Sequence, residues 1–175
     1  MRQMTRLNVE AMQDEPQRKY HKRKRPDTPL EKQRAKTWTA FSRFIRLRDC
    51  LQATGTIYRG KCCTCGKEYP IGKLQAGHFM PGRMDSVLFD EDQTHAQCYR
   101  CNVLLSGMWP AYYRFMEERH GKETIDVMIQ EWFDAARKRD MTEPQLRSWQ
   151  VYYEREAERL QRQRSVSDDS RSIAK

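Results

Sequence analysis

The chain has 175 residues, of which 38% are hydrophobic and 33% charged, so it suits one domain with a small core and is not expected to fold along its whole length. Lys and Arg total 33 against 24 acidic residues, and the net charge of +9 favours a polyanion such as nucleic acid, a basic soluble protein without such a partner being the alternative. No apolar run approaches the roughly 20 residues of a membrane span, and no segment resembles a signal peptide, so we expect no membrane partner and a cytoplasmic location.

The N-terminal residues 1–30 lack apolar periodicity and are predicted to form a flexible basic arm. Its basic side chains cluster at Lys22, Arg23, Lys24 and Arg25. Over residues 31–51, apolar residues recur at spacings of three and four, which predicts an amphipathic helix. This apolar face comprises Trp38, Phe41, Phe44 and Ile45, and the other face carries Arg43, Arg46 and Arg48. Residues 57–89 have no helical period, and their glycines indicate short strands and turns.

Helices are predicted again in the second half of the chain. A short helix runs from about Cys98 to Leu105 and stops at Gly107, and others cover residues 109–119 and 123–138. A last helix begins at Thr142, where Thr, Pro and Gln match a capping box. The Ser- and Asp-rich residues 164–175 are predicted to be a disordered tail. The sequence therefore predicts an α+β fold with one domain over residues 31–163, its core over 57–107 and helical flanks over 31–51 and 109–163.

Two Cys-x-x-Cys pairs are separated by about 32 residues, and they comprise Cys62, Cys65, Cys98 and Cys101. Cysteines in a reducing compartment favour a metal over disulfides, and four thiolates at this spacing can bind a structural Zn²⁺. Small buried thiols or a redox pair are the alternatives. A zinc ion would add folding free energy to a lean core, but with four cysteine ligands it has no open position for chemistry. Cys50 and Cys63 fit no ligand spacing and are expected only to pack.

Polar residues beside the cysteine pairs form a second constellation. It comprises His78 at a predicted strand end, Gln93 and His95 before the second pair, and Asn102 directly after it. Phosphodiester hydrolysis requires an imidazole that accepts a proton and oxygen or nitrogen ligands for a hard cation. The alternative is that His78 is a partly buried strand histidine and that the two amides cap turns.

At this point the chain resembles the zinc-knuckle HNH endonucleases, whose fold is the ββα-metal or His-Me finger. The resemblance narrows to the NinG/Rap family of phage recombination endonucleases, on the segments Ala76-Gly77-His78-Phe79, Phe89-Asp90-Glu91-Asp92, and His95 to Asn102 followed by Leu105-Ser106-Gly107. It extends over roughly residues 41–160 and does not include the arm. It implies a small ββα-metal zinc-knuckle core flanked by helices, in a structure-selective DNA endonuclease that uses Mg²⁺ or Mn²⁺ on branched DNA such as D-loops and Holliday junctions. A phage or host recombinase would then be a partner, and the host cytoplasm the location.

The resemblance also implies roles for single residues. His78 would be the general base that activates water, and Asn102 and His95 would bind the catalytic ion. Gln93 stands where the motif has Asn and would orient the loop of His78. Gly77 stands where many HNH enzymes have a metal-binding side chain, so the compensating ligand would be one of Asp85, Asp90, Asp92 or His95. The expected products carry 5′-phosphate and 3′-hydroxyl ends.

Several basic and aromatic residues are candidates for DNA contacts. The basic ones are Arg83, Arg100 and Arg114, extended by Arg43, Arg46 and the arm, with a solvated surface charge as the alternative for each. Trp109, Tyr112 and Tyr113 could stack on unpaired bases at a branch point, although their spacing favours a core role. A homodimer would place two active sites on a near-symmetric junction, and the last helix could form its interface or pack on its own domain. The alternative function is a zinc-knuckle DNA-binding protein that recruits recombination factors and does not cut.

Overall fold

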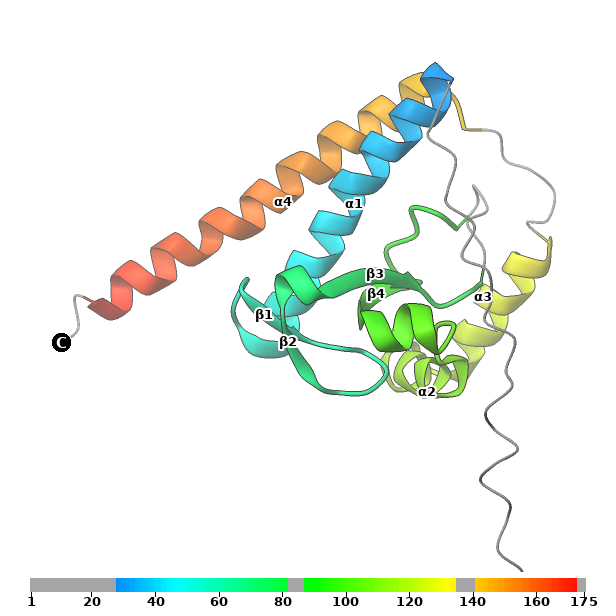
Figure 1. The fold of residues 1–175 in the computed structure, drawn as a ribbon, viewed down its shortest axis with the longest axis horizontal. Helices are drawn as coiled ribbons and strands as arrows, with labels where there is room; N and C mark the ends of the chain where they lie inside the picture. Colours follow the sequence, from blue (N-terminus) through cyan, green and yellow to red (C-terminus); the bar gives the residue numbers. More distant parts are fainter. Residues whose placement is uncertain (1–27, 82–86, 135–140, 173–175) are drawn as a thin grey trace, which may run out of the picture.

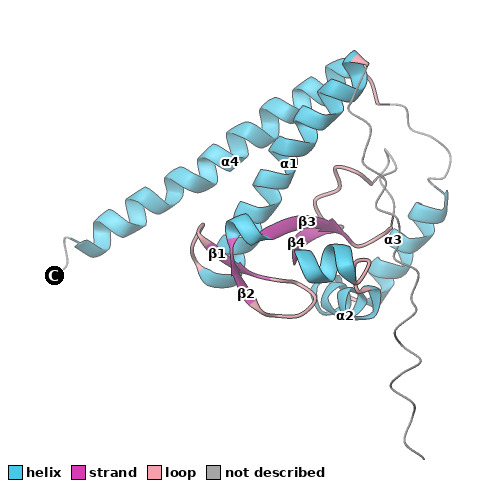
Figure 2. Ribbon diagram, viewed as in Figure 1, coloured by secondary structure: helices cyan, strands magenta, loops and turns pink. Residues whose placement is uncertain are grey.

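The computed structural model describes residues 28–81, 87–134 and 141–172, with side chains up to residue 162. Two long helices, α1 (Pro29–Thr54) and α4 (Glu143–Ser172), lie side by side along one edge of the molecule (Figure 1). Two small β-hairpins and two further helices pack below α1 (Figure 2). The predicted α+β class is confirmed. None of the described helices is long and apolar enough to cross a bilayer.

Helix α1 has sequence signals at both ends. The Glu31 amide donates to Thr28 Oγ1 at 3.2 Å and the Thr28 amide donates to Glu31 Oε2 at 3.0 Å, which completes a capping box. Pro29 follows the cap, and the helix ends at Gly55, whose φ of 68° suits a residue without a side chain.

The main core lies between α1 and α4, which run in the same direction. The Gln33 side chain donates to Gln150 at 2.7 Å near their starts. Further along, the fully buried Phe41 ring contacts Tyr153 at 4.9 Å and Phe89 at 5.6 Å between centroids. Aromatic packing of this kind anchors the segment before β4 to both helices.

The two hairpins are antiparallel. The first pairs β1 (Arg59–Lys61) with β2 (Glu68–Pro70), and the 3-10 turn η2 (Ile71–Lys73) leads into the second. The second pairs β3 (Leu74–His78) with β4 (Thr94–Cys98), in a register that sets Gly77 opposite His95 and Gln75 opposite Gln97. Because each described sheet has two strands, the outer edge of β3 stays unpaired.

A π-helical turn, η3 (Arg100–Leu104), follows β4 and leads to α2 (Trp109–His120) and α3 (Lys122–Asp134). These helices form a smaller apolar cluster with the residues after β3. Its buried members are Phe79, Met80, Tyr112, Met116 and Ile125. This cluster and α1 hold the β3–β4 hairpin from two sides.

The predicted helices are confirmed with shifted ends. Helix α1 extends beyond 31–51 in both directions, and the short helix predicted from Cys98 is the π turn η3, because Cys98 is the last residue of β4. Helix α3 is described to Asp134, and positions 135–138 of its prediction lie outside the described residues. Helix α4 is described to Ser172, and positions 173–175 of the predicted disordered tail lie outside the described residues.

Candidate functional site

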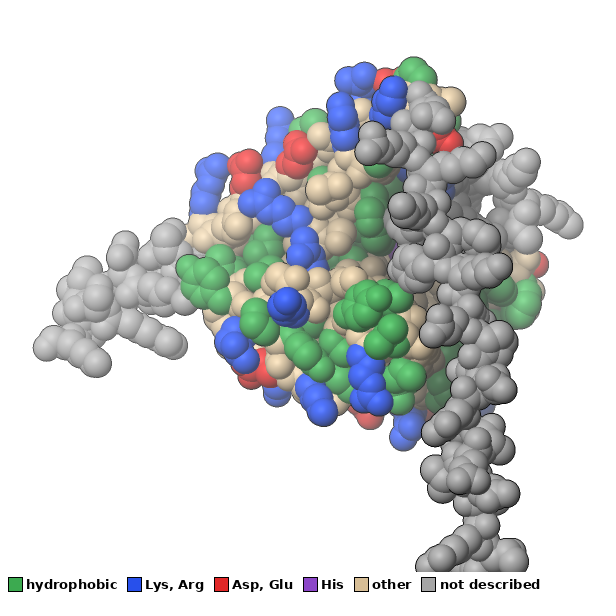
Figure 3. Space-filling view, viewed as in Figure 1, with side chains coloured by type: hydrophobic (Ala, Val, Ile, Leu, Met, Phe, Trp, Pro, Cys, Tyr) green, Lys and Arg blue, Asp and Glu red, His purple; other side chains and the backbone are tan. Residues whose placement is uncertain are grey.

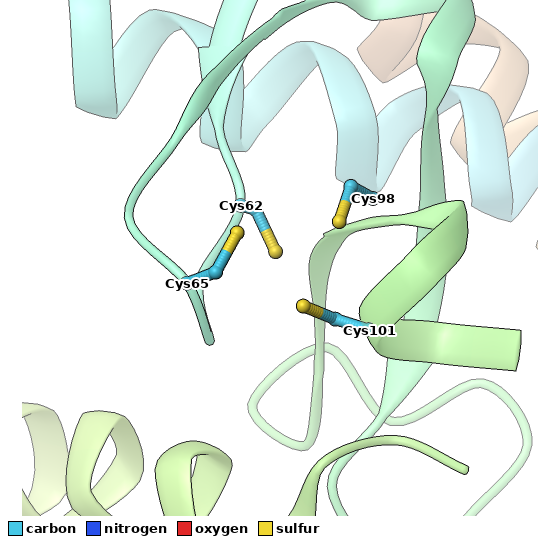
Figure 4. Close-up of side chains that lie close together, drawn as sticks. All are labelled: Cys62, Cys65, Cys98 and Cys101. Atoms are coloured by element: carbon cyan, nitrogen blue, oxygen red, sulfur yellow. The ribbon is translucent and has the colours of Figure 1, made fainter. Parts of the chain in front are cut away.

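The four paired cysteines converge, as the sequence predicted. Their Sγ atoms all lie within 4.8 Å of one another (Figure 4). One pair lies on the turn between β1 and β2, and the other lies at the end of β4 and in η3. Zn–S bonds of about 2.3 Å place the sulfurs of a tetrahedral site roughly 3.8 Å apart, so a small contraction would suit this donor set to zinc. The cluster is consistent with a structural Zn²⁺.

Local backbone contacts shape the first knuckle. The Gly66 amide donates to Cys62 O at 2.9 Å, and the Cys63 amide donates to Ala96 O at 2.9 Å, which ties the knuckle to β4. Burial raises the pKa of the Cys62 thiol, but hydrogen bonds from Thr64 and from backbone amides outweigh burial and lower the pKa to about 7. A thiol with this pKa readily gives the thiolate that binds a metal.

The two cysteines outside the cluster, Cys50 and Cys63, pack against neighbouring side chains. Cys50 is fully buried against Leu74 and Ala96. Burial raises the pKa of the Cys63 thiol well above its ordinary value, which disfavours a reactive thiolate.

A groove of about 850 Å³ runs along the unpaired edge of β3, between α1 and η3. His78 and Asn102 both line it, so the structure brings together two residues of the predicted catalytic set. The other polar or aromatic lining residues are Trp38, Ser42, Arg46, Gln75, Tyr99 and Ser106. No acidic residue lines the groove in the described part of the chain.

His78 is held with a defined orientation at the end of β3. Its ring stacks on Trp38 at 5.1 Å between centroids and an interplanar angle of 22°. Its Nε2 lies 3.0 Å from Leu88 O. Because a carbonyl oxygen only accepts, Nε2 carries a proton, and in the neutral imidazole Nδ1 then carries the basic lone pair. This is the tautomer that a general base acting through Nδ1 needs.

The two predicted amide residues are placed differently. Asn102 Nδ2 donates to Gln75 Oε1 at 2.8 Å, which leaves Asn102 Oδ1 as the acceptor on the side of Gly77. Gln93 is buried, and its backbone oxygen accepts from the Phe79 amide at 2.7 Å. Gln93 thus holds the strand end beside His78 through its backbone rather than through its side chain.

His95 does not lie in the groove. It is 1% exposed and lines a separate cavity of about 320 Å³. Its Nδ1 lies 3.3 Å from an Asp49 carboxylate oxygen and 3.2 Å from the Arg48 guanidinium, and its Nε2 lies 3.2 Å from Asp92 O. These contacts give His95 a structural role, and its role as a ligand of the catalytic ion stays a prediction.

Arg48 and Asp49 are the structural residues that sequence reasoning missed. The Arg48 guanidinium donates to the carbonyls of Glu91 and Thr94, each at 2.8 Å. An Asp49 carboxylate oxygen accepts from the Ala96 amide at 2.6 Å. The signal was available, because Asp49 is a charged residue four positions after Ile45 on the inner stripe of α1.

Asp49→Asn is expected to lower the free energy of unfolding by about 3 kcal/mol at neutral pH, because it leaves a largely buried Arg48 without its carboxylate. Burial raises the pKa of Asp49, but contacts with His95 and Arg48 outweigh burial and hold the pKa below its ordinary value. The carboxylate therefore stabilises the fold above the unfolded-state pKa of about 4, and this contribution is lost as the pH falls through the lower folded-state pKa. Urea unfolding at pH 7, where both proteins keep their zinc, measures the difference in the free energy of unfolding. Equal free energies of unfolding for the two proteins at pH 7 would contradict the assignment.

The predicted phosphate-binding residues divide into three groups. Arg46 lines the groove, and its guanidinium donates to the carbonyls of Ser42 and Ile71. Burial lowers the pKa of Arg46, as expected of a cation that would gain from an anionic ligand. Arg43, Arg100 and Arg114 are exposed. Arg83 and the basic cluster of the arm lie outside the described residues, as does Asp85.

Basic side chains are prominent on the face drawn in Figure 3. Lys and Arg cover more of it than Asp and Glu do, and hydrophobic side chains lie among them. Of the three aromatic candidates, Tyr112 is a core residue, as its spacing in the sequence favoured. It is 1% exposed, and its hydroxyl donates to Gly77 O at 2.8 Å. Trp109 is 45% exposed and stacks on Phe79 at 6.2 Å, and Tyr113 is half-buried. Trp109 is therefore the most exposed of these three candidates.

The family model of the bacteriophage lambda NinG protein matches residues 2–163, which includes the N-terminal arm. No curated protein and no solved structure matches the chain. The extent of the family match shows that the chain belongs to the NinG family.

Proposed function

We propose that this protein is a metal-dependent endonuclease that hydrolyses phosphodiesters in branched DNA such as D-loops and Holliday junctions. The observation that carries the proposal is that His78 and Asn102 line one groove with Arg46, and that no acidic residue is among its described lining. A base, a hard oxygen ligand and a cation along one groove suit an anionic phosphodiester. Membership of the NinG family supports the same reading.

In this proposal His78 is the general base. Its Nδ1 accepts a proton from water while Nε2 donates to Leu88 O, and stacking on Trp38 keeps the ring from turning. A positioned base of this kind contributes about 10²- to 10⁴-fold to the rate. Arg46 binds a phosphate oxygen with its guanidinium, which orients the phosphorus for in-line attack.

The residues of the groove fit a hard divalent ion. Asn102 Oδ1 is an oxygen donor of the kind that Mg²⁺ and Mn²⁺ prefer, and its amide nitrogen is already turned away toward Gln75. When bound, such an ion neutralises charge on the phosphate and on the departing 3′ oxygen. The four-cysteine cluster has a separate, structural role.

Selection of branched DNA rests on the family resemblance and on the surface beside the groove. The exposed Arg100 and Arg114 would contact phosphates, and the exposed Trp109 could stack on an unpaired base. A homodimer on a near-symmetric junction and a recombinase partner stay predictions.

The test is a cleavage assay with the purified full chain on a four-way junction, a D-loop and a matched linear duplex, with Mg²⁺, Mn²⁺ or EDTA. We expect metal-dependent cutting of the branched substrates, with 5′-phosphate ends. Equal cutting of the linear duplex would overturn the branch selectivity. Tight junction binding without cutting in any metal would instead favour a zinc-knuckle protein that recruits recombination factors.

A further inference from the structure

A buried amide next to the groove has an unsatisfied oxygen. Gln97 lies on β4 and is 0% exposed. Its Nε2 donates to Gly107 O at 2.9 Å, which fixes the orientation of the amide because a carbonyl cannot donate. Its Oε1 has no hydrogen-bond partner among the described residues. A buried, unpartnered oxygen costs free energy and calls for a physical explanation.

The oxygen points at the place where residue 77 would have a side chain. A Cβ added to Gly77 would lie 2.0 Å from Gln97 Oε1 and 3.1 Å from Asn102 Oδ1. The two amide oxygens therefore lie on the same side of Gly77, and both amides are turned by their own donated hydrogen bonds. Residue 77 directly precedes His78 on β3, and Asn102 lines the same groove as His78.

We infer that Gln97 Oε1 and Asn102 Oδ1 together bind the divalent cation, with Gln97 supplying across the hairpin the ligand that Gly77 cannot. The inference rests on the proposed function and names a ligand for the same site. The inference also explains why residue 77 is a glycine, because a side chain at this position would displace the Gln97 oxygen.

The charge of this ligand pair has a consequence for when the cation binds. Both oxygens are uncharged, and no acidic residue is among the described lining of the groove. Mg²⁺ and Mn²⁺ bind proteins mainly through carboxylates and substrate phosphates. The free protein therefore binds the cation weakly, and the DNA phosphate supplies the negative charge that completes the site.

The test measures Mn²⁺ binding by electron paramagnetic resonance, on zinc-loaded protein bound to a four-way junction. The His78→Gln background keeps the DNA intact, and the junction alone is the blank. We expect Gln97→Met to weaken Mn²⁺ binding by about 10-fold or more, by analogy with the loss of groups that support metal ligands. Gly77→Ala should do the same, since its Cβ displaces Oε1. Gln33→Met makes the same change in a buried amide between α1 and α4 and should have no effect. Zinc content and circular dichroism check that each variant is folded.

The weak cation binding expected of an uncharged ligand pair can be tested separately, by measuring Mn²⁺ binding in the absence of DNA. Asn102→Asp adds a negative charge to the pair, and Gln75 can turn its amide to donate to the new carboxylate. This variant should bind Mn²⁺ more tightly than the parent protein when no DNA is present.

The outcomes separate this inference from the proposed function. Unchanged Mn²⁺ binding in Gln97→Met, with binding lost in Asn102→Ala, would overturn the role of Gln97 and leave the nuclease proposal standing. Mn²⁺ binding no stronger than that of the junction alone, together with no cleavage by the protein with His78 intact, would overturn both.

Discussion

Removal of zinc is expected to unfold the two hairpins and η3. The apolar packing around them is small, with one cluster made of Cys50, Leu74 and Ala96. A structural zinc ion contributes about 10–16 kcal/mol in zinc-finger peptides at neutral pH, which equals or exceeds the whole stability of a typical domain, about 5–15 kcal/mol. Asn102 directly follows a cysteine of the cluster, so the groove should be lost with the metal.

The measurement is zinc content by atomic absorption together with circular dichroism, before and after a strong chelator, and in Cys98→Ser. We expect about one zinc per chain, and loss of cooperative unfolding when it is removed. Cys50→Ala is the matched control, because Cys50 is just as buried but lies outside the cluster. It should keep its zinc and lose only packing free energy. A chelated protein that still unfolds cooperatively would show that the apolar clusters alone are sufficient.

Replacement of His78, the proposed general base, should abolish most of the cleavage without affecting DNA binding. In His78→Gln, the amide nitrogen can still donate to Leu88 O, so the strand end should keep its place. The variant loses the basic Nδ1 lone pair, and the rate should fall by about 10²- to 10⁴-fold. Single-turnover cleavage of a labelled four-way junction in Mg²⁺ measures the rate, and a gel-shift titration measures binding.

His120→Gln makes the same chemical change at the end of α2, outside the described lining of the groove. It should cut at the rate of the unaltered protein. Parent-like cleavage by His78→Gln would mean that another group is the base. Equal losses of cleavage and binding in that variant would point to a structural role for His78.

Features that depend on neighbours in the sequence could be predicted from the sequence. Helix α1 was predictable because its apolar stripe is local, and α4 because its Thr142 cap is local. The four-cysteine cluster was predictable because each Cys-x-x-Cys pair forms its own turn, and a single structural metal would draw the two turns together.

The composition of the groove was decided by pairing between distant segments. His95 and Asn102 both flank the second cysteine pair, yet the Arg48–Asp49 pair of α1 encloses His95 while η3 turns Asn102 toward Gly77. The strand register sets which side chains face each other across the hairpin, and it places Gln97 within reach of Gly77. In sequence, Gln97 is one more polar residue beside a cysteine.

The sequence by itself thus determined the helices, the cysteine cluster and the likeness to the NinG family, since these follow from spacing and local periodicity. Only the tertiary structure decided which of the polar residues share the groove with His78. Their positions depend on strand register, on the open edge of β3 and on the buried ion pair of α1, which are contacts between residues far apart in the chain.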